Sequence, residues 1–579
     1  MPIDEKTRDS YFSWKPEEDP EFAPMIYGRG TIGGKGRSLL FAIRMLRECG
    51  DAHLSRVCLP ESIYFSTEMF HRFIESVPSL EGLISADDPN ALERAFLLTP
   101  LPGEVTQAIK KFLSNINDPV VVRSSSMLED SVKYSFAGKY LSTFFGNNTG
   151  GVDERTARVE SEIKKIYARI YFPQAVSYKK RHGLGDDEMG IIVMRITGRW
   201  CGSFYYPTLG GVGYSKNYRR WTTRVRQEDG VLRLVFGLAT MSTKRGYART
   251  VSLTNPTLRP EGQNPDKVAF HAQEKFHVIS WSNPDELTVV DVNKNWRQLL
   301  DNHADYEAFA QLYHREFESD MFMSVPKNMK VMSPDSKICF TFENFPKKYP
   351  KFFERMKMML DLLENSMGVP ADIEYAGEPA DEQLYLIQSR PLWNNDCQEN
   401  IIPPLEGKHV LLQADRMVTH GAAEHIKVIV YVDHHLYYTS PNFYTVARRL
   451  GEVNSALAGE PYILVSPGRI GSSNPELGVP VQYDEITNCC CIVELGLPRF
   501  GYMPELSYGT HFFSDLEVDN VLYMPVFDGE GRNIYDREWF KDAGWEQGPD
   551  PSIRIYRGDF SAYMDSQANR GVIIENISS

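Results

Sequence analysis

The segment at 121–143, VVRSSSMLEDSVKYSFAGKYLST, constrains this chain of 579 residues more than any other. A short apolar run ends at Arg123, three serines follow, and a small-residue turn comes at 136–138. An arginine presents a planar fork of donors, and hydroxyls and turn amides add more, so a strand that ends in this way can hold a phosphate. The same residues also fit a surface strand followed by a polar loop, and local chemistry leaves both interpretations open.

A second segment, TIGGKG at 31–36, is a glycine-rich turn before a helical pattern. It is not a Walker A loop, because position 29 is arginine and Gly36, rather than Ser or Thr, follows Lys35. Bare backbone amides, a helix N-terminus and an ammonium group together favour anionic oxygens. The alternative is that Lys35 simply lies at the start of a helix.

A third segment, at 372–391, carries oxygen ligands on a predicted strand pair. Asp372 and Glu374 are two residues apart, so their side chains share a face of the first strand, and Gln388 on the next strand adds a carbonyl oxygen. Hard oxygen ligands of this kind suit Mg²⁺. Arg390 can reach a phosphate from the face of Gln388. The alternative is a surface hairpin with a cross-strand ion pair worth well under ~1 kcal/mol.

These three segments, in this order, resemble the nucleotide-binding domain shared by phosphoenolpyruvate synthase, pyruvate phosphate dikinase and rifampin phosphotransferase. The resemblance implies an α+β fold with a two-lobed ATP-grasp domain that uses ATP and Mg²⁺. It implies that Glu374 and Gln388 hold Mg²⁺, with Asp372 nearby, and that Lys35, Arg123 and Arg390 hold phosphates. The other residues that it places near the nucleotide are Gly34, Gly138, Lys139 and Ser142, with Met194 and Arg195 at the adenine hinge.

Three features depart from the family pattern. Gln often stands where this chain has Arg195, and the segment at 237–239 is less rich in glycine than its family counterpart. The turn VTHGA at 418–422 resembles the histidine turn of rifampin phosphotransferase, but the continuation expected after it is absent. A nucleophilic histidine on a small-residue turn is chemically sensible. We nevertheless expect that the phosphoryl acceptor is external and that His420 is not a carrier.

The resemblance implies an ATP-grasp domain at 26–395. The composition of the rest predicts a loose leader at 1–25, a linker at 396–407, a β-rich or α/β C-terminal module at 408–525, and a tail at 526–579. Some enzymes of the resembled family also carry a large barrel domain for pyruvate. About 185 residues follow Arg390, too few for a barrel of ~250 residues. The module resembles the C-terminal part of bacterial proteins that carry a PEP/pyruvate-binding domain. Its turns at 467–473 and 507–511 could bind an anion or supply a base, or could be structural.

The pattern of apolar residues also predicts individual elements. Helices are expected at 38–49, 66–74, 160–181 and 353–367, and strands at 189–197, 203–215, 232–237, 372–375 and 383–388. The three consecutive cysteines at 489–491 predict a buried strand, because their spacing suits neither a disulfide framework nor a zinc site.

Composition narrows the class of protein. The net charge of −14 argues against a nonspecific nucleic-acid footprint. No apolar run has the length of a membrane span, and the polar, acidic N-terminus is not a secretory signal. We therefore expect a cytoplasmic protein without nucleic-acid or membrane partners, and the oligomeric state stays open.

The sequence thus predicts an ATP-dependent phosphotransferase that acts on a small-molecule or protein acceptor. Two alternatives remain from the residues alone. One is a nucleotide-binding regulatory or scaffold protein without turnover. The other is an ATP-grasp ligase that works through an acyl phosphate.

Overall fold

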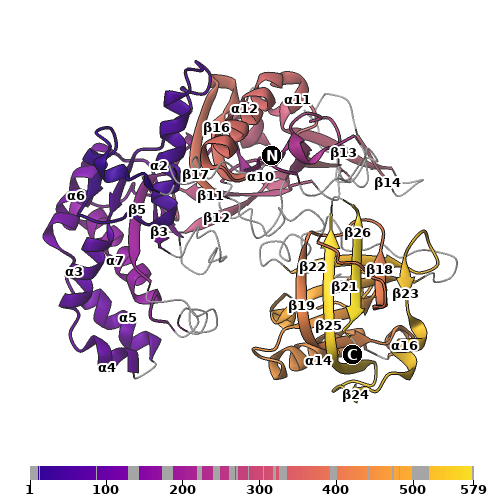
Figure 1. The fold of residues 1–579 in the computed structure, drawn as a ribbon. Helices are drawn as coiled ribbons and strands as arrows, with labels where there is room; N and C mark the ends of the chain where they lie inside the picture. The colour runs from indigo at the N-terminus through magenta and orange to yellow at the C-terminus, as the bar shows by residue number, and fades with distance from the viewer. Residues whose placement is uncertain are drawn as a thin grey trace. The chain divides into compact units, whose positions relative to one another are not determined.

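A computed structural model shows two compact units, one formed by Met1–Asn217 with Glu228–Trp393 and one by Tyr218–Gln227 with Asn394–Ser579 (Figure 1). The structure describes most of the chain. The described residues are 11, 13–85, 88–127, 142–172, 176, 187–217, 224–238, 248–259, 268, 272–284, 286–303, 305–316, 321–324, 336–391, 401–440, 442–471, 475–481, 483–497, 521–566 and 568–576.

The first unit begins with a five-stranded sheet in the order β1-β2-β5-β3-β4. Its strands are β1 (Ile26–Tyr27), β2 (Ser62–Phe65), β3 (Val120–Ser126), β4 (Ser142–Phe145) and β5 (Met189–Arg195). One face packs against α3 (Thr67–Ser76), α5 (Pro89–Leu98), α6 (Gly103–Asn115) and α7 (Val152–Arg169), while α2 (Gly33–Glu48) packs on the other. Every residue of β3 is buried, so Arg123 and the three serines lie inside the protein.

A second, antiparallel sheet has the order β10-β9-β8-β16-β17. Its strands are β8 (Leu209–Tyr214), β9 (Val231–Val235), β10 (Arg249–Ser252), β16 (Ala371–Glu378) and β17 (Gln383–Pro391). The helix α12 (Pro350–Met367) packs on β16 and ends at Gly368, which adopts the left-handed conformation that glycine favours (φ 68°). The helix α2 contacts both β3 and β17, and therefore lies between the two sheets.

Two smaller sheets complete the first unit, in the orders β12-β11-β7-β6 and β14-β13-β15. Their strands are β6 (Arg199–Cys201), β7 (Phe204–Tyr206), β11 (Lys275–Ser280), β12 (Leu287–Asp291), β13 (Ala310–Glu316), β14 (Met321–Ser324) and β15 (Ser336–Phe340). The other helices of four or more residues in its described part are α4 (Leu80–Ser85), α10 (Val292–Asn302) and α11 (Phe345–Lys348).

The second unit is built on one sheet in the order β22-β21-β20-β19-β25-β26-β18-β23, with β24 paired to β25. The bounds are β18 (His409–Ala414), β19 (Gly421–Val432), β20 (Tyr462–Pro467), β21 (Cys489–Gly496), β22 (Leu522–Phe527), β23 (Ile534–Tyr535), β24 (Glu546–Gln547), β25 (Ile553–Asp565) and β26 (Arg570–Glu575). The strands β19 to β22 are parallel, and the α-helices in the described part of this unit are α13 (His434–Tyr438), α14 (Phe443–Ala456) and α16 (Arg537–Asp542). One face packs against α14, and the other forms a separate apolar core.

Most predicted elements are present, including the buried strand of cysteines, β21. The helix predicted at 160–181 differs: α7 begins at Val152 and ends at Arg169. Its start is fixed by Glu154, whose carboxylate accepts the Gly151 N–H at 3.0 Å. This capping contact is local and precedes the apolar pattern on which the prediction relied.

Three predicted boundaries do not match the packing. The leader is not loose from residue 13 onward, because Phe22 is buried in the same core as α2 and Tyr11. The linker prediction also changes, since Ile401, Ile402 and Leu405 pack against the C-terminal sheet. The boundary at residue 525 falls inside β22, and the expected tail supplies β25 and β26 to the middle of that sheet. The burial of β25 does not alternate, so its sequence lacks a strand signature.

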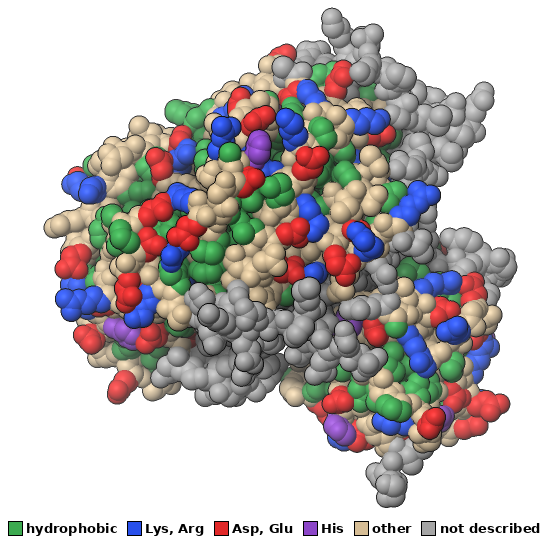
Figure 2. All heavy atoms as spheres, turned by 45° about the horizontal axis from the view of Figure 1, so that its top comes forward, with side chains coloured by type: hydrophobic (Ala, Val, Ile, Leu, Met, Phe, Trp, Pro, Cys, Tyr) green, Lys and Arg blue, Asp and Glu red, His purple; other side chains and the backbone are tan. Residues whose placement is uncertain are grey.

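The surface drawn in Figure 2 carries acidic and basic side chains interspersed over both units. Within the described part of the chain, no helix combines the length and the apolar character needed to cross a membrane.

Candidate functional site

Four polar side chains predicted from the third segment lie on one face of the second sheet. In the register of β16 and β17, Asp372 is paired with Arg390 and Glu374 with Gln388. Cross-strand partners point to the same side of a sheet. The opposite face carries apolar residues that pack into the core, including Ile373 and Tyr375. These four side chains, with Val212 and Tyr214 of β8, line a small pocket.

A β-bulge gives Gln388 and Arg390 this orientation. Glu374 is opposite Gln388, but the next residue, Tyr375, is opposite Leu386, so Ile387 is the extra residue of β17. An inserted residue reverses the alternation of side chains along the bulged strand. Leu386 therefore faces the apolar core with Tyr375, while Gln388, two residues later, faces the pocket.

Arg123 reaches this face from the other sheet. Its guanidinium donates to the main-chain oxygen of Ile387 at 3.0 Å and to Glu374 Oε2 at 3.1 Å, and it also donates to Gln388 Oε1. The Arg123 side chain is only 7% exposed, so its charge is compensated mainly by these acceptors. The contact brings together residues about 250 positions apart in the chain.

Arg390 and Asp372 form the second charged pair of the site, with Arg390 Nη2 and Asp372 Oδ2 2.5 Å apart. Asp372 is 4% exposed. Burial raises the pKa of its carboxyl above the ordinary value, and the Arg390 guanidinium opposes that rise. A cross-strand ion pair on a surface hairpin was the alternative interpretation; here the pair is present, but its acid is buried.

The glycine turn lies against the end of β3. Gly33 has a φ of +77°, and a Cβ there would meet the main-chain oxygen of Ser125 at 1.7 Å, so both conformation and space require glycine. Ser125 Oγ accepts the Gly36 N–H at 3.0 Å and donates to the oxygen of Ile32 at 2.7 Å. Lys35, in the first turn of α2, places Nζ 3.5 Å from Ser124 Oγ, next to Arg123 along β3.

The remaining predicted nucleotide residues are placed as follows. Gly34 lies in the first turn of α2, and Ser142 is opposite Arg123 in the register of β4 and β3. Met194 is fully buried in the core, while Arg195 pairs with Glu61 at 2.9 Å and Asp118 at 3.1 Å. Those pairs hold the Arg195 side chain at the end of β5. Gly138 and Lys139 lie outside the described residues, as does Ala239 of the departing segment.

Sequence reasoning missed Arg233, the central residue of β9. It is opposite Val212 in β8, which is itself opposite Glu374, so Arg233 shares the face of the four polar side chains. Its guanidinium lies 5.8 Å from the ring centroid of Tyr214, and its charge lowers the pKa of Asp372, against the larger effect of burial. The signal was a lone charged residue in the apolar run VLRLV.

His420 is enclosed in the second unit, where its side chain is 3% exposed. Its Nδ1 accepts the N–H of Ser566 at 3.2 Å. The same nitrogen lies 3.8 Å from Asp565 Oδ1, so it is enclosed by contacts within the second unit rather than open to a phosphate. This enclosure supports the expectation that His420 is not a carrier.

The described part of the turn at 467–473 uses its amides internally. The Arg469 N–H donates to the oxygen of Leu477 at 2.7 Å, and the Gly471 N–H to that of Val479 at 2.8 Å. Ser472 and Ser473 lie outside the described residues, as does the turn at 507–511.

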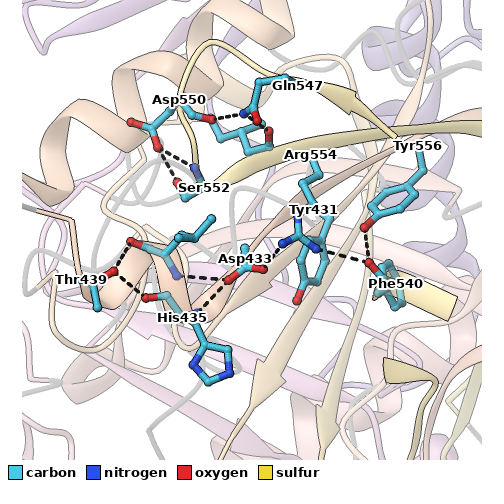
Figure 3. A network of polar contacts seen from close by, with 12 residues as sticks. Tyr431, Asp433, His435, Thr439, Phe540, Gln547, Asp550, Ser552, Arg554 and Tyr556 are labelled. Carbon is cyan, nitrogen blue, oxygen red and sulfur yellow. Dashed lines mark hydrogen bonds and ion pairs between the residues drawn. The ribbon is translucent and has the colours of Figure 1, made fainter. Parts of the chain in front are cut away.

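Charged residues elsewhere in the second unit serve local structure, as Figure 3 illustrates. Asp433 accepts the N–H groups of His435 and Leu436 at the start of α13 and forms an ion pair with Arg554 at 2.6 Å. Asp550 likewise accepts from the N–H and hydroxyl of Ser552. These contacts close turns and cap a helix.

The chemistry of the pocket fits a hard divalent cation held by few protein ligands. The described residues contain no cluster of three or more His, Cys, Asp and Glu side chains able to enclose a metal. Glu374 and Gln388, however, already direct an oxygen each toward a single cation, the Nη2 end of Arg123. Two oxygen ligands with phosphate and water completing the shell is the mode in which proteins usually hold Mg²⁺.

Comparison with known proteins identifies the family of the chain. Residues 29–404 match the family model described as "Pyruvate phosphate dikinase, AMP/ATP-binding domain". The match covers well over half of the chain, so the protein belongs to this family. Lys35, Arg123, Asp372, Glu374, Gln388 and Arg390 all lie within the matched region.

Among curated relatives, the chain is 25% identical over 381 residues to the phosphoenolpyruvate synthase of Pseudomonas aeruginosa and 22% identical over 375 residues to that of Deinococcus radiodurans. These alignments cover 62% of this chain but 40% and 39% of the two enzymes. A rifampicin phosphotransferase of Streptomyces sviceus is 25% identical over 185 residues, which is 29% of this chain and 19% of that enzyme. The chain thus matches less than half the length of each of these relatives.

Proposed function

We propose that this protein is an ATP-dependent phosphotransferase that binds Mg-ATP at the face of the second sheet. The observation that carries the proposal is the meeting of Arg123, from one sheet, with Glu374 and Gln388 of another. Bringing a buried cation, an acid and an amide together from distant parts of the chain is costly unless a ligand uses them. The AMP/ATP-binding description of the family supports a nucleotide as that ligand.

In the proposed complex, Arg123 and Arg390 grip phosphate oxygens through their planar forks, and Lys35 adds a mobile point charge from the start of α2. Glu374 and Gln388 would hold Mg²⁺, which neutralises charge on the phosphates when bound. Asp372 holds Arg390 in place through their 2.5 Å contact. Preorganised cations of this kind lower the barrier because phosphoryl transfer spreads negative charge over the equatorial oxygens.

Arg233 extends the same face by one more cation. It joins Arg123 and Arg390 on the face that carries Asp372 and Glu374. We assign Arg233 to an anionic group near Tyr214, either the terminal phosphate of ATP or the group that receives it.

We assign the acceptor role to a molecule outside the described site, and its identity stays open. The buried ring of His420 and its hydrogen bond from Ser566 speak against that histidine. A small molecule or a group on a partner protein remains the proposed acceptor.

A ³¹P NMR time course with Mg-ATP and candidate acceptors tests the proposal. Transfer of the γ-phosphate yields ADP, and transfer of the β-phosphate yields AMP, as distinct resonances. Binding of ATP with no acceptor-dependent change, across a broad acceptor panel, would instead favour a regulatory protein without turnover. ADP and phosphate formed only when a carboxylic acid and an amine are both present would favour a ligase. Glu374→Gln, which keeps the shape of the side chain, is the matched control for turnover at this site.

A further inference from the structure

Arg123 donates hydrogen bonds to the oxygen atoms that a metal would need as ligands. Its Nη2 nitrogen donates to both Glu374 Oε2, at 3.1 Å, and Gln388 Oε1, while Nη1 donates to the oxygen of Ile387 at 3.0 Å. Glu374 and Gln388 are the two residues proposed to hold Mg²⁺. The Arg123 guanidinium therefore binds the two oxygens that the metal would use.

The backbone sets this arrangement. Glu374 and Gln388 are cross-strand partners, and their side chains emerge side by side. The bulge at Ile387 leaves its carbonyl outside the regular pairing, and Arg123 Nη1 donates to that carbonyl. Three acceptor oxygens of one hairpin thus bind a single guanidinium group. Because the Arg123 side chain is 7% exposed, water replaces few of these contacts.

Arg123 and a metal exclude each other at these oxygens. Mg²⁺ lies about 2.0–2.1 Å from its ligands, closer than a hydrogen-bonded nitrogen, and it needs the same lone pairs. A divalent cation beside a buried guanidinium is also repelled by it. Free metal would therefore have to displace Arg123 without offering it another anionic partner.

A nucleotide removes this conflict. Phosphate oxygens accept the guanidinium fork in the bidentate way that carboxylates do, so Arg123 can exchange Glu374 and Gln388 for the phosphates of ATP. The two freed oxygens then face the metal that the same phosphates carry.

We propose that Arg123 is the resident counter-cation of the metal ligands, and that this site accepts a divalent cation only together with a nucleotide phosphate. The inference rests on the proposed function for the identity of the ligand. It specifies the ligand as a metal–nucleotide complex rather than as a metal followed by a nucleotide.

Mn²⁺ alone is the probe, because its electron paramagnetic resonance signal distinguishes the free aquo ion from the bound ion. Without nucleotide, we expect the wild-type protein to leave Mn²⁺ free at concentrations where Arg123→Gln retains it, with at least a tenfold difference in affinity. Arg72→Gln, which removes an exposed arginine paired with Glu104 on α3 and α6, should behave as wild type. Adding Glu374→Gln to Arg123→Gln should release the ion again.

Equal Mn²⁺ affinity of the wild type and Arg123→Gln without nucleotide would overturn the inference. If circular dichroism shows that Arg123→Gln does not fold, the wild type alone decides, because the inference requires ADP to increase its Mn²⁺ retention beyond the binding of Mn²⁺ by ADP in solution. Wild-type protein that holds Mn²⁺ equally with and without ADP would refute it. Absence of ATP binding would remove the proposed function, whereas the nucleotide-free comparison judges Arg123 independently.

Discussion

In the first unit, charged side chains of β16 and β17 contact a cation from a different sheet. In the second unit, the charged side chains of β19 and β25, and Asp433 directly after β19, mostly contact the adjacent strand or the helix that follows. Arg123 crosses from β3 to Glu374. Asp433, by contrast, caps the helix that follows it and pairs with Arg554 on the adjacent strand. The first arrangement places a cation, an acid and an amide at one pocket, and the second caps a helix and pairs neighbouring strands.

This difference shows that a short sequence match is weak evidence for a catalytic residue. The VTHGA turn matches a catalytic turn in sequence, but His420 is enclosed by Asp565 and Ser566 at the end of β25. The three segments that bear Lys35, Arg123 and Glu374 lie far apart in sequence and come together in one unit. Convergence of distant residues is a stronger indication of function than a local match.

The largest expected effect is on catalysis. Glu374→Gln should lower the rate of phosphoryl transfer by about 10²–10³-fold, the size of losing one preorganised charge-stabilising group, and should change ATP affinity far less. Steady-state kinetics with varied Mg²⁺, compared with calorimetric ATP binding, checks this. Glu382→Gln, at the exposed tip of the same hairpin, is the control and should have no effect. Parallel losses of affinity and rate would assign Glu374 a structural role.

A smaller effect is expected on the stability of the second unit. Asp433→Ala removes a helix cap and an ion pair, and should lower its unfolding free energy by about 1–2 kcal/mol. Asp433→Asn retains an acceptor oxygen and should cost less. Denaturant melts measure both, and Mg-ATP affinity should stay unchanged because the proposed site lies in the first unit. A change in nucleotide affinity would contradict the division of roles between the units.

The pH dependence of the second unit offers a finer comparison. The hydrogen bond to Asp536, helped by that to Glu575, raises the pKa of His409 above its usual value of about 6.5. Protonated His409 therefore adds its full contribution to the unfolding free energy below about pH 6.5, and this contribution disappears as the pH rises through the folded-state pKa of His409. His409→Gln should flatten this part of the stability profile. A wild-type profile that rises over the same range and is unchanged in the variant would be inconsistent with the assignment.

No effect is expected from His420 on phosphoryl transfer. Incubation with labelled ATP should leave no acid-labile, base-stable label on the protein, the behaviour that would mark a phosphohistidine. His420→Ala and the exposed control His425→Ala should therefore transfer phosphate at wild-type rates. Stoichiometric label that maps to His420 would make this histidine a carrier and reverse the comparison between the units.

The sequence indicated which residues form the candidate site, but it did not indicate which contacts they make with one another. Residue type and spacing marked Lys35, Arg123, Glu374, Gln388 and Arg390. The bulge at Ile387 was not foreseen, because an extra residue in a strand leaves no trace in a short apolar pattern. The register pairs Arg390 with Asp372, a pairing that residue type and spacing did not specify.

The fold was predictable where apolar periodicity is strong, as in α2, α12 and the strands β16 and β17. It was less so at the ends of the chain. Phe22 is buried within a proline-rich segment, and β25 carries exposed and buried residues without alternation. Both segments derive their structure from packing against elements distant in sequence, which local propensity does not encode.

Isothermal titration of Mg-ATP into the wild-type protein and into Arg390→Gln tests the central claim, that the face shared by Asp372, Glu374, Gln388 and Arg390 holds the nucleotide. We predict one ATP per chain for the wild type and clearly weaker binding for the variant. At 100 times Kd, ATP should also stabilise the wild type by about 2.7 kcal/mol. Absence of binding to the folded wild type, or undiminished binding to Arg390→Gln, would contradict the account.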